Sequence, residues 1–139
     1  MGRGNIDVRT IREWPPADIR ALYEAAGWWQ DGTDEAEIAP LIRGSFRFAA
    51  AIADGRLVGM GRVLSDGVSD GYIQDVTVLP EFRGMGIGAA IIRFLSDQCV
   101  QAGLTWIGLV AEPGTVPFYE RLGFTPLQGH VAMRYHRKD

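Results

Sequence analysis

Arginine and glycine fill most of the segment RGMGIG, residues 83–88, which separates a strand-like run, YIQDVTVLPEF, from a helical run, AAIIRFLSDQCVQAG. The first N–H groups of a helix have no partner within the helix, and Gly84, Gly86 and Gly88 have no side chain that could accept from them. Glycine also lets the backbone approach a bulky anion, and Arg83 adds a permanent positive charge. Together with the helix dipole, these features favour a phosphate site over a strand-to-helix turn without a ligand.

Two common nucleotide sites fit this segment poorly. The run GMGIGA has the G-x-G-x-x-G/A spacing of dinucleotide-binding folds, but those folds place an acidic residue at the end of the next strand. Here the next strand-like run, TWIGLV, is followed by no acid before Glu112, and 139 residues do not accommodate that fold. The segment also lacks the Lys-Ser/Thr ending of a Walker loop. A phosphate ligand of another kind is therefore expected.

Length and composition predict one domain, residues 1–139, with neither a metal nor a nucleic-acid partner. The chain is 47% hydrophobic and 22% charged, with a formal net charge of −3, which is typical of a globular domain and unlike a nucleic-acid binder. Its apolar runs are too short to cross a membrane, and its first residues lack the apolar core of a signal peptide. Cys99 is the single cysteine, and with the two histidines it forms no metal-ligand spacing. A reducing, cytoplasmic location is expected.

The order of the elements predicts an α/β or α+β fold with helices on both sides of one mixed sheet. Asp54-Gly55 is a strong hairpin signal between two strand-like runs. Thr33 or Asp34 is expected to cap a helix that Gly44 ends. Strands are expected at residues 6–11, 46–53, 56–64, 72–78, 106–110 and 131–135, and further helices at residues 17–26, 86–102 and 116–122.

The segment VTVLPEFRGMGIGAAII resembles the acetyl-coenzyme-A motif of the GNAT superfamily of N-acetyltransferases. The core of that motif, Q/R-x-x-G-x-G/A, is met by Arg83, Gly86 and Gly88, and Val78 and Pro80 stand where the family tends to have them. A second stretch, PFYERLGF, is similar to the family's tyrosine-bearing helix and following strand. The two motifs are separated by one helix and one strand, as in the family, and the order of elements fits along nearly the whole chain.

The resemblance implies an enzyme that passes an acetyl group from acetyl-coenzyme A directly to a primary amine of a small molecule or peptide. It implies a mostly antiparallel sheet in which two parallel strands, residues 72–78 and 106–110, splay apart around the cofactor. Backbone N–H groups of residues 83–89 would hold the pyrophosphate, and residues 76 and 78 would pair with the pantetheine arm. Many relatives are homodimers, so a homodimer is expected. The implied cofactor-binding residues are Val76, Thr77, Val78, Arg83, Gly84, Met85, Gly86, Ile87, Gly88, Ala89, Phe118 and Tyr119.

The resemblance also implies residues for the proton transfers. Tyr119 matches the family tyrosine that serves as general acid for the departing coenzyme-A thiolate. Asp75 and Glu112 are both predicted as the base, acting directly or through water. Many relatives have glutamate where Gln74 stands and asparagine where Glu112 stands, so the choice between the two carboxylates stays open.

Trp28 and Trp29 lie in GWWQDG, between the first two predicted helices, where the family covers its acceptor pocket. They are predicted either to line a pocket for an apolar or cationic amine, or to pack, one in the core and one on the surface. A function of another class is also compatible with the motifs, namely a non-catalytic acyl-coenzyme-A binding or sensing domain. Tyr119 and the two carboxylates favour catalysis, whereas the unusual Gln74 and Glu112 favour the sensor.

Overall fold

The computed structural model describes residues 5–138, which fall into two compact units, one ending at Leu109 and the other beginning at Val110. Short 3-10 turns, Glu35–Glu37 and Pro80–Phe82, precede α2 and α3. The second unit contains α4 (Val116–Glu120). In chain order, the elements of the first unit are β1 (Ile6–Thr10), α1 (Pro16–Ala25), α2 (Ile38–Gly44), β2 (Arg47–Ala53), β3 (Arg56–Ser65), β4 (Asp70–Val78), α3 (Ile87–Gln101) and β5 (Trp106–Leu109).

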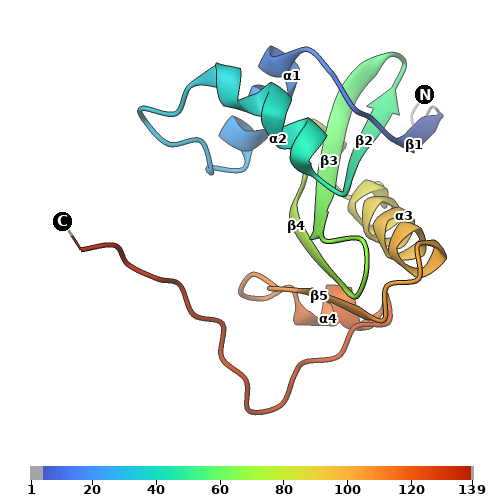
Figure 1. Ribbon diagram of the computed structural model, residues 1–139. Helices are drawn as coiled ribbons and strands as arrows, with labels where there is room; N and C mark the ends of the chain where they lie inside the picture. The colour runs from blue at the N-terminus through green and yellow to red at the C-terminus, as the bar shows by residue number, and fades with distance from the viewer. Residues whose placement is uncertain (1–4, 139) are drawn as a thin grey trace. The chain divides into compact units, whose positions relative to one another are not determined.

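The five strands of the first unit form one sheet in the order β1-β2-β3-β4-β5 (Figure 1). Neighbouring strands are antiparallel except β4 and β5, which are parallel. This confirms the predicted mixed sheet with one parallel pair. The predicted β2–β3 hairpin is also present: Asp54 and Gly55 have φ of 49° and 77°, and a two-residue type I′ turn requires positive φ at both positions.

Helices α1 and α2 pack on one face of this sheet (Figure 1). Their apolar sides are buried against side chains of β2 and β3, since burial of apolar surface is what holds an amphipathic helix on a sheet. Asp34, one of the two predicted caps, accepts a hydrogen bond from the N–H of Ala36 at 2.9 Å just before α2. The core on this face includes Ile19, Leu22, Tyr23, Ile38, Ile42, Phe48, Ala50 and Met60.

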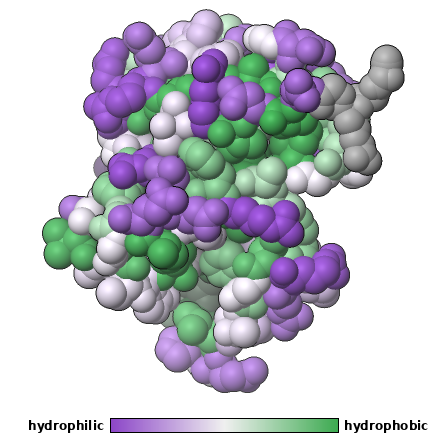
Figure 2. All heavy atoms as spheres, turned by 90° about the vertical axis from the view of Figure 1, so that its right-hand side faces the viewer, coloured by the Kyte–Doolittle hydropathy of each residue, from purple (hydrophilic) through white to green (hydrophobic). Residues whose placement is uncertain are grey.

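Helix α3 covers the other face and confirms the strongest helix prediction. A Cβ placed on Gly61 of β3 would lie 2.9 Å from Ile91 and 3.1 Å from Leu95 of α3, so the helix packs closely on the strand. Figure 2, which views the molecule from the side on which α3 lies, shows hydrophilic and hydrophobic residues mixed over that surface. The predicted apolar repeat of α3 is at most 3% exposed, at Ile87, Ile91, Leu95 and Cys99.

No helix in residues 5–138, α3 included, has the length and hydropathy needed to cross a membrane.

The last predicted strand is wrong. Residues 131–135 form neither helix nor strand in the second unit, and Val131, Met133 and Tyr135 are 80%, 91% and 84% exposed. Their alternation with polar residues shows only that the segment would suit a strand, because a strand also needs a neighbour with which to pair. The described part of the second unit, residues 110–138, contains no strand. The predicted first residue of β4 is also wrong, since the strand begins at Asp70 rather than at residue 72.

Candidate functional site

The glycine turn between β4 and α3 leaves the start of α3 open, as predicted. Gly84 and Gly86 have φ of 80° and 81°, a left-handed conformation that residues with a Cβ rarely adopt. Gly86 is the N-cap of α3, and no side chain of residues 5–138 caps the helix with a hydrogen bond. A Cβ on either glycine would have no described heavy atom within 4 Å. Backbone conformation rather than crowding therefore requires glycine here, and the space around the turn is open to a ligand.

Arg83 lies at the same turn and is tied to the end of β4. Its Nε donates a hydrogen bond to the carbonyl oxygen of Val78 at 3.0 Å, and the residue as a whole is exposed. The nearby Glu81 carboxylate is engaged by Arg56 at 3.0 Å. Arg83 precedes Gly86, the N-cap of α3, by three residues, so the turn carries a permanent positive charge in addition to the positive end of the α3 dipole, which favours an anion.

Among the described residues, no strand pairs with the edge of β4 beyond its contact with β5. The two strands pair only over residues 70–73 of β4 and 106–109 of β5. On its other side β4 continues along β3 as far as the pair between Val78 and Gly59. Because β5 ends at Leu109, residues 74–78 of β4 have no partner in β5, and the predicted splaying of the parallel pair stays a prediction.

The direction of the backbone groups along this edge follows from the neighbouring hydrogen bonds. The N–H of Leu79 donates to the carbonyl oxygen of Val58 in β3 at 2.8 Å. Because successive residues of a strand direct their backbone groups to opposite sides, Val78 and Val76 direct theirs away from β3, to the open edge. The bond from Arg83 to the Val78 carbonyl agrees with this direction. The N–H groups that were predicted to pair with a ligand thus lie along the unpaired edge.

A β-bulge interrupts β4 at Asp75. The register of β3 and β4 shifts between Met60 and Arg62, so that Asp75 and Val76 lie opposite the single residue Gly61. Asp75 has φ of 58°, a left-handed conformation inside a strand. Sequence reasoning predicts β4 as a regular strand and does not anticipate this bulge.

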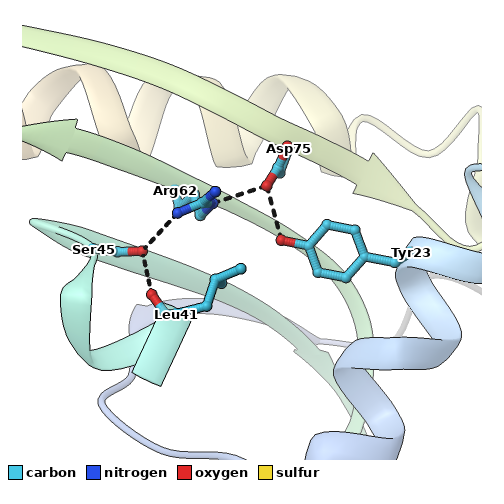
Figure 3. A network of polar contacts seen from close by, with 5 residues as sticks. All are labelled: Tyr23, Leu41, Ser45, Arg62 and Asp75. Atoms are coloured by element: carbon cyan, nitrogen blue, oxygen red, sulfur yellow. Dashed lines mark hydrogen bonds and ion pairs between the residues drawn. The ribbon is translucent and has the colours of Figure 1, made fainter. Parts of the chain in front are cut away.

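The Asp75 carboxylate is held by two donors from different elements (Figure 3). Its Oδ2 accepts from Nε of Arg62 in β3 and from the phenol of Tyr23 in α1, both at 2.8 Å. Burial, and then the charge and hydrogen bond of Asp75, raise the pKa of Tyr23 far above its usual value, so the phenol remains a donor at neutral pH. A proton that binds to Oδ2 would have to displace one of these two donors. The role of Asp75 as the base stays a prediction.

Tyr23 and Arg62 are not among the site residues predicted from the sequence. Tyr23 lies 52 positions from Asp75 and Arg62 lies 13 positions from it, so no local spacing connects them. One signal was present: Arg62 is a charged residue within an otherwise apolar run of β3, and Asp75 is an acidic residue in the next strand. Buried or half-buried charges usually have partners of opposite charge, which points from one to the other.

Trp28 and Trp29 follow α1 in the chain, and both pack against the core. Each is partly buried, and each ring centroid lies 6.4 Å from that of Tyr23. The guanidinium of Arg20 lies 4.9 Å from the ring centroid of Trp29, a cation–π contact. Neither tryptophan is an isolated surface residue, and both extend the aromatic cluster around Tyr23. Their contact with an acceptor stays a prediction.

In the second unit, Tyr119 lies in a small aromatic cluster. Its ring centroid is 5.0 Å from Phe118 and 6.0 Å from Phe124, both in edge-to-face geometry. Burial and, to a smaller extent, the negative charge of Glu112 raise the pKa of Tyr119, so that the phenol keeps its proton at neutral pH. Within this unit the structure therefore brings the rings of Phe118, Tyr119 and Phe124 together, and the charge of Glu112 acts on Tyr119. The cofactor and catalytic roles of Phe118, Tyr119 and Glu112 stay predictions.

Comparison with known proteins agrees with the motifs. Residues 9–124 match the model of the acetyltransferase (GNAT) family. The uncharacterized N-acetyltransferase ycf52 of Pyropia yezoensis is 34% identical over 111 residues, which are 77% of this chain and 63% of that protein. This chain thus spans less than two thirds of the length of that relative.

Solved structures share the fold. A putative acetyltransferase of the GNAT family from Xanthomonas campestris pv. campestris is 29% identical with a TM-score of 0.77, covering 97% of this chain and 96% of that one. AAC(6')-Iy, solved with the bisubstrate analogue CoA-S-monomethyl-acetylneamine, has a TM-score of 0.75, covering 96% of this chain and 100% of that one. At 17% identity, this second likeness concerns the fold alone.

Proposed function

Because the chain belongs to the acetyltransferase (GNAT) family, we propose that it is an acetyl-coenzyme-A-dependent N-acetyltransferase, moving an acetyl group directly to a primary amine of a small molecule or peptide. The observation that carries this proposal is the open start of α3, with its two left-handed glycines and Arg83, directly after the unpaired edge of β4. The open helix start supplies N–H groups and positive charge for phosphates, and the edge of β4 supplies N–H groups for the amide-rich pantetheine arm.

The cofactor would use both features. Backbone N–H groups of residues 83–89 would bind the pyrophosphate, with the charge of Arg83 beside them. Val76 and Val78 would pair with the pantetheine arm as an added strand pairs with a sheet edge. An N–H on this edge would also stabilise the negative charge that develops on the acetyl carbonyl oxygen, an effect often worth ~3 kcal/mol. The coenzyme-A analogue bound by AAC(6')-Iy supports the use of this fold for such a ligand.

Two residues of the second unit are proposed for the proton transfers. The amine acceptor is mostly an ammonium ion at neutral pH and must lose a proton before it attacks. We assign this proton to Glu112, since the Asp75 carboxylate is held through Oδ2 by Arg62 and Tyr23 and so has a structural role of its own. Tyr119 would protonate the leaving thiolate, a role that suits a phenol whose raised pKa keeps it protonated.

The acceptor is proposed to be a cationic amine. The net charge of −3 favours the approach of a cation, and the half-buried Trp28 and Trp29 offer aromatic surface for one. The analogue bound by AAC(6')-Iy joins coenzyme A to an acetylneamine, which supports a small-molecule amine. The second candidate, a non-catalytic acyl-coenzyme-A sensor, is favoured by the replacement of the family's usual residues at Gln74 and Glu112.

Coenzyme-A release with a panel of amines tests the proposal. The purified chain is mixed with acetyl-coenzyme A and a polyamine, an aminoglycoside, an amino acid, an arylalkylamine or a lysine peptide, and free thiol is measured. We expect thiol release that depends on one class of amine. Calorimetric binding of coenzyme A without release for any amine would support the sensor, and absence of both binding and release would refute both functions.

A further inference from the structure

We propose that Asp75 is a positioning residue: held by Arg62 and Tyr23, it fixes the bulge of β4, and the bulge turns the N–H groups of Val76 and Val78 to the open edge. This inference rests on the proposed function only for what those N–H groups bind. It gives Asp75 a role through the backbone in place of its predicted role as the base.

The backbone of Asp75 needs external support. Among the described residues other than glycine, only Asp54 and Asp75 have positive φ, 49° and 58°. Asp54 lies in the two-residue turn between β2 and β3, where the turn itself requires that conformation. Asp75 lies within a strand, and a left-handed residue with a Cβ persists there only if surrounding contacts hold it.

Those contacts are the two bonds to Oδ2 (Figure 3). The side chains of Arg62 and Asp75 are 13% and 23% exposed, so their ion pair is largely shielded from water. Charge-assisted hydrogen bonds in such surroundings are stronger than exposed ones. Nη1 of Arg62 also lies 3.5 Å from Oγ of the buried Ser45, which itself donates to the carbonyl oxygen of Leu41 at 2.8 Å. The network thus joins α1, α2, β3 and β4.

The bulge reverses the alternation of β4. Before it, Gly71 faces α3, because a Cβ there would lie 3.1 Å from Sγ of Cys99. After it, Val76 faces α3, because its Cγ2 lies 3.0 Å from a Cβ placed on Gly61, which also meets Ile91. An odd and an even position share one face only if one residue is inserted between them. The same insertion decides which N–H groups face β3 and which face the open edge.

Three substitutions at position 75 separate this role from that of a base. Asp75→Asn keeps an oxygen acceptor for both donors and a side chain that tolerates positive φ. Asp75→Gly removes the carboxylate but adopts the left-handed conformation freely. Asp75→Ala removes the carboxylate and keeps the Cβ that disfavours this conformation. We expect the dissociation constant for coenzyme A, measured by calorimetry, to stay within about threefold for Asn and to rise about tenfold or more for Ala, with Gly between them.

Asp54→Ala is the matched control. It introduces the same side chain at the other positive φ, in a turn that the proposed site does not use. We expect this variant to lose stability but to bind coenzyme A like the unmodified chain. If Asp75→Ala does not fold, Tyr23→Phe removes one of the two donors with less disruption, and we expect a weaker but measurable loss of coenzyme-A affinity.

The pH profile of kcat identifies a base. If Asp75 positions the backbone, the acidic limb of the profile persists in Asp75→Asn and kcat stays within a few fold. A hundredfold fall of kcat in Asp75→Asn with unchanged coenzyme-A affinity, together with loss of that limb, would show that Asp75 is the base and would overturn the inference.

Amide hydrogen exchange in the ligand-free chain tests the bulge independently of the proposed function. We expect slow exchange at Thr77 and Leu79, which face β3, and fast exchange at Val76 and Val78, with this contrast reduced in Asp75→Ala. An unchanged contrast and an unchanged coenzyme-A affinity in that variant would overturn the inference. Failure of the unmodified chain to bind coenzyme A would instead refute the proposed function, while the exchange pattern would still decide the role of Asp75 in the bulge.

Discussion

Among single side chains, Tyr119 offers the most direct test of the proposed chemistry. Tyr119→Phe keeps the ring contacts with Phe118 and Phe124 and removes only the proton donor. We expect coenzyme-A affinity within a few fold of the original and a kcat that is lower by ~10², the usual scale for one general acid. Burial and the charge of Glu112 raise the pKa of Tyr119, so activity should persist to alkaline pH in the original chain.

The alkaline limb of kcat against pH is the second measurement for this variant. In the original chain the limb reports loss of the phenol proton, and in Tyr119→Phe it should flatten or move. Tyr135→Phe, at an exposed tyrosine of the same unit, serves as the control. Unaltered kcat and limb in Tyr119→Phe would reduce Tyr119 to a packing residue, and the proton would have to come from water.

The residues of the candidate site differ in whether their conformation and partners can be predicted from the sequence. Gly84, Gly86 and Arg83 are predictable because their chemistry is local: a short run supplies the open helix start and the charge together. The partners of Asp75 are not predictable from spacing, since Tyr23 and Arg62 approach it only after α1 has packed on the sheet and β3 has paired with β4. The positive φ of Asp75 is equally unpredictable from the sequence, because aspartate occurs both at negative φ and, more rarely, in the left-handed region at positive φ.

At the scale of elements, the start of α3 gives a sharp prediction. Gly86→Val introduces a β-branched side chain at φ of 81°, which strains the turn and fills the open space beside the N–H groups. We expect the dissociation constant for acetyl-coenzyme A to rise about tenfold or more, or ~1.4 kcal/mol. Calorimetry on the folded variant measures this change.

Gly103→Val controls for strain in the same prediction. Gly103 follows the other end of α3, has φ of 84°, and likewise has no described heavy atom within 4 Å of an added Cβ. The substitution should destabilise the chain to a similar degree and leave cofactor affinity unchanged. A folded Gly86→Val variant with the original affinity would place the phosphate site elsewhere.

Elements with strong local signals are the ones predicted correctly. Helix α3 has an apolar residue at every fourth position and a glycine at each end. The β2–β3 hairpin has Asp54-Gly55 between two apolar runs. Residues 131–135 carry only alternation, which does not supply a partner strand, and there the prediction fails. The bulge in β4 depends on contacts with β3 and α1, so the pattern within β4 cannot reveal it.

Across the whole molecule, the predicted homodimer stays a proposal. Mass by light scattering at micromolar concentration tests it, and a monomer mass would reject it. Val131, Met133 and Tyr135 of the second unit are exposed, and we propose that association buries them, because exposed apolar residues gain from removal from water.

The free energy of unfolding should carry a signature of Tyr23 at alkaline pH. Burial and Asp75 raise the pKa of Tyr23 in the folded chain, whereas in the unfolded chain it is about 10. Its contribution to stability is therefore fully present below pH ~10 and is lost as the pH rises toward the folded pKa, by ~1.4 kcal/mol for each pH unit. Tyr23→Phe has no phenol to ionise and lacks this loss.

We therefore expect Tyr23→Phe to be less stable than the original chain by ~1–3 kcal/mol at pH 7, the cost of losing a hydrogen bond to a charged group. That difference should shrink steadily above pH ~10, because only the original chain then gains free energy by ionising Tyr23 on unfolding. Urea unfolding followed by tryptophan fluorescence at pH 7, 9, 10 and 11 measures it, and all other titrating groups cancel between the two chains. Tyr135→Phe should match the original chain throughout. A difference between Tyr23→Phe and the original chain that stays constant to pH 11 would mean that the phenol ionises as freely in the folded state as in the unfolded one, and that it is not held by Asp75.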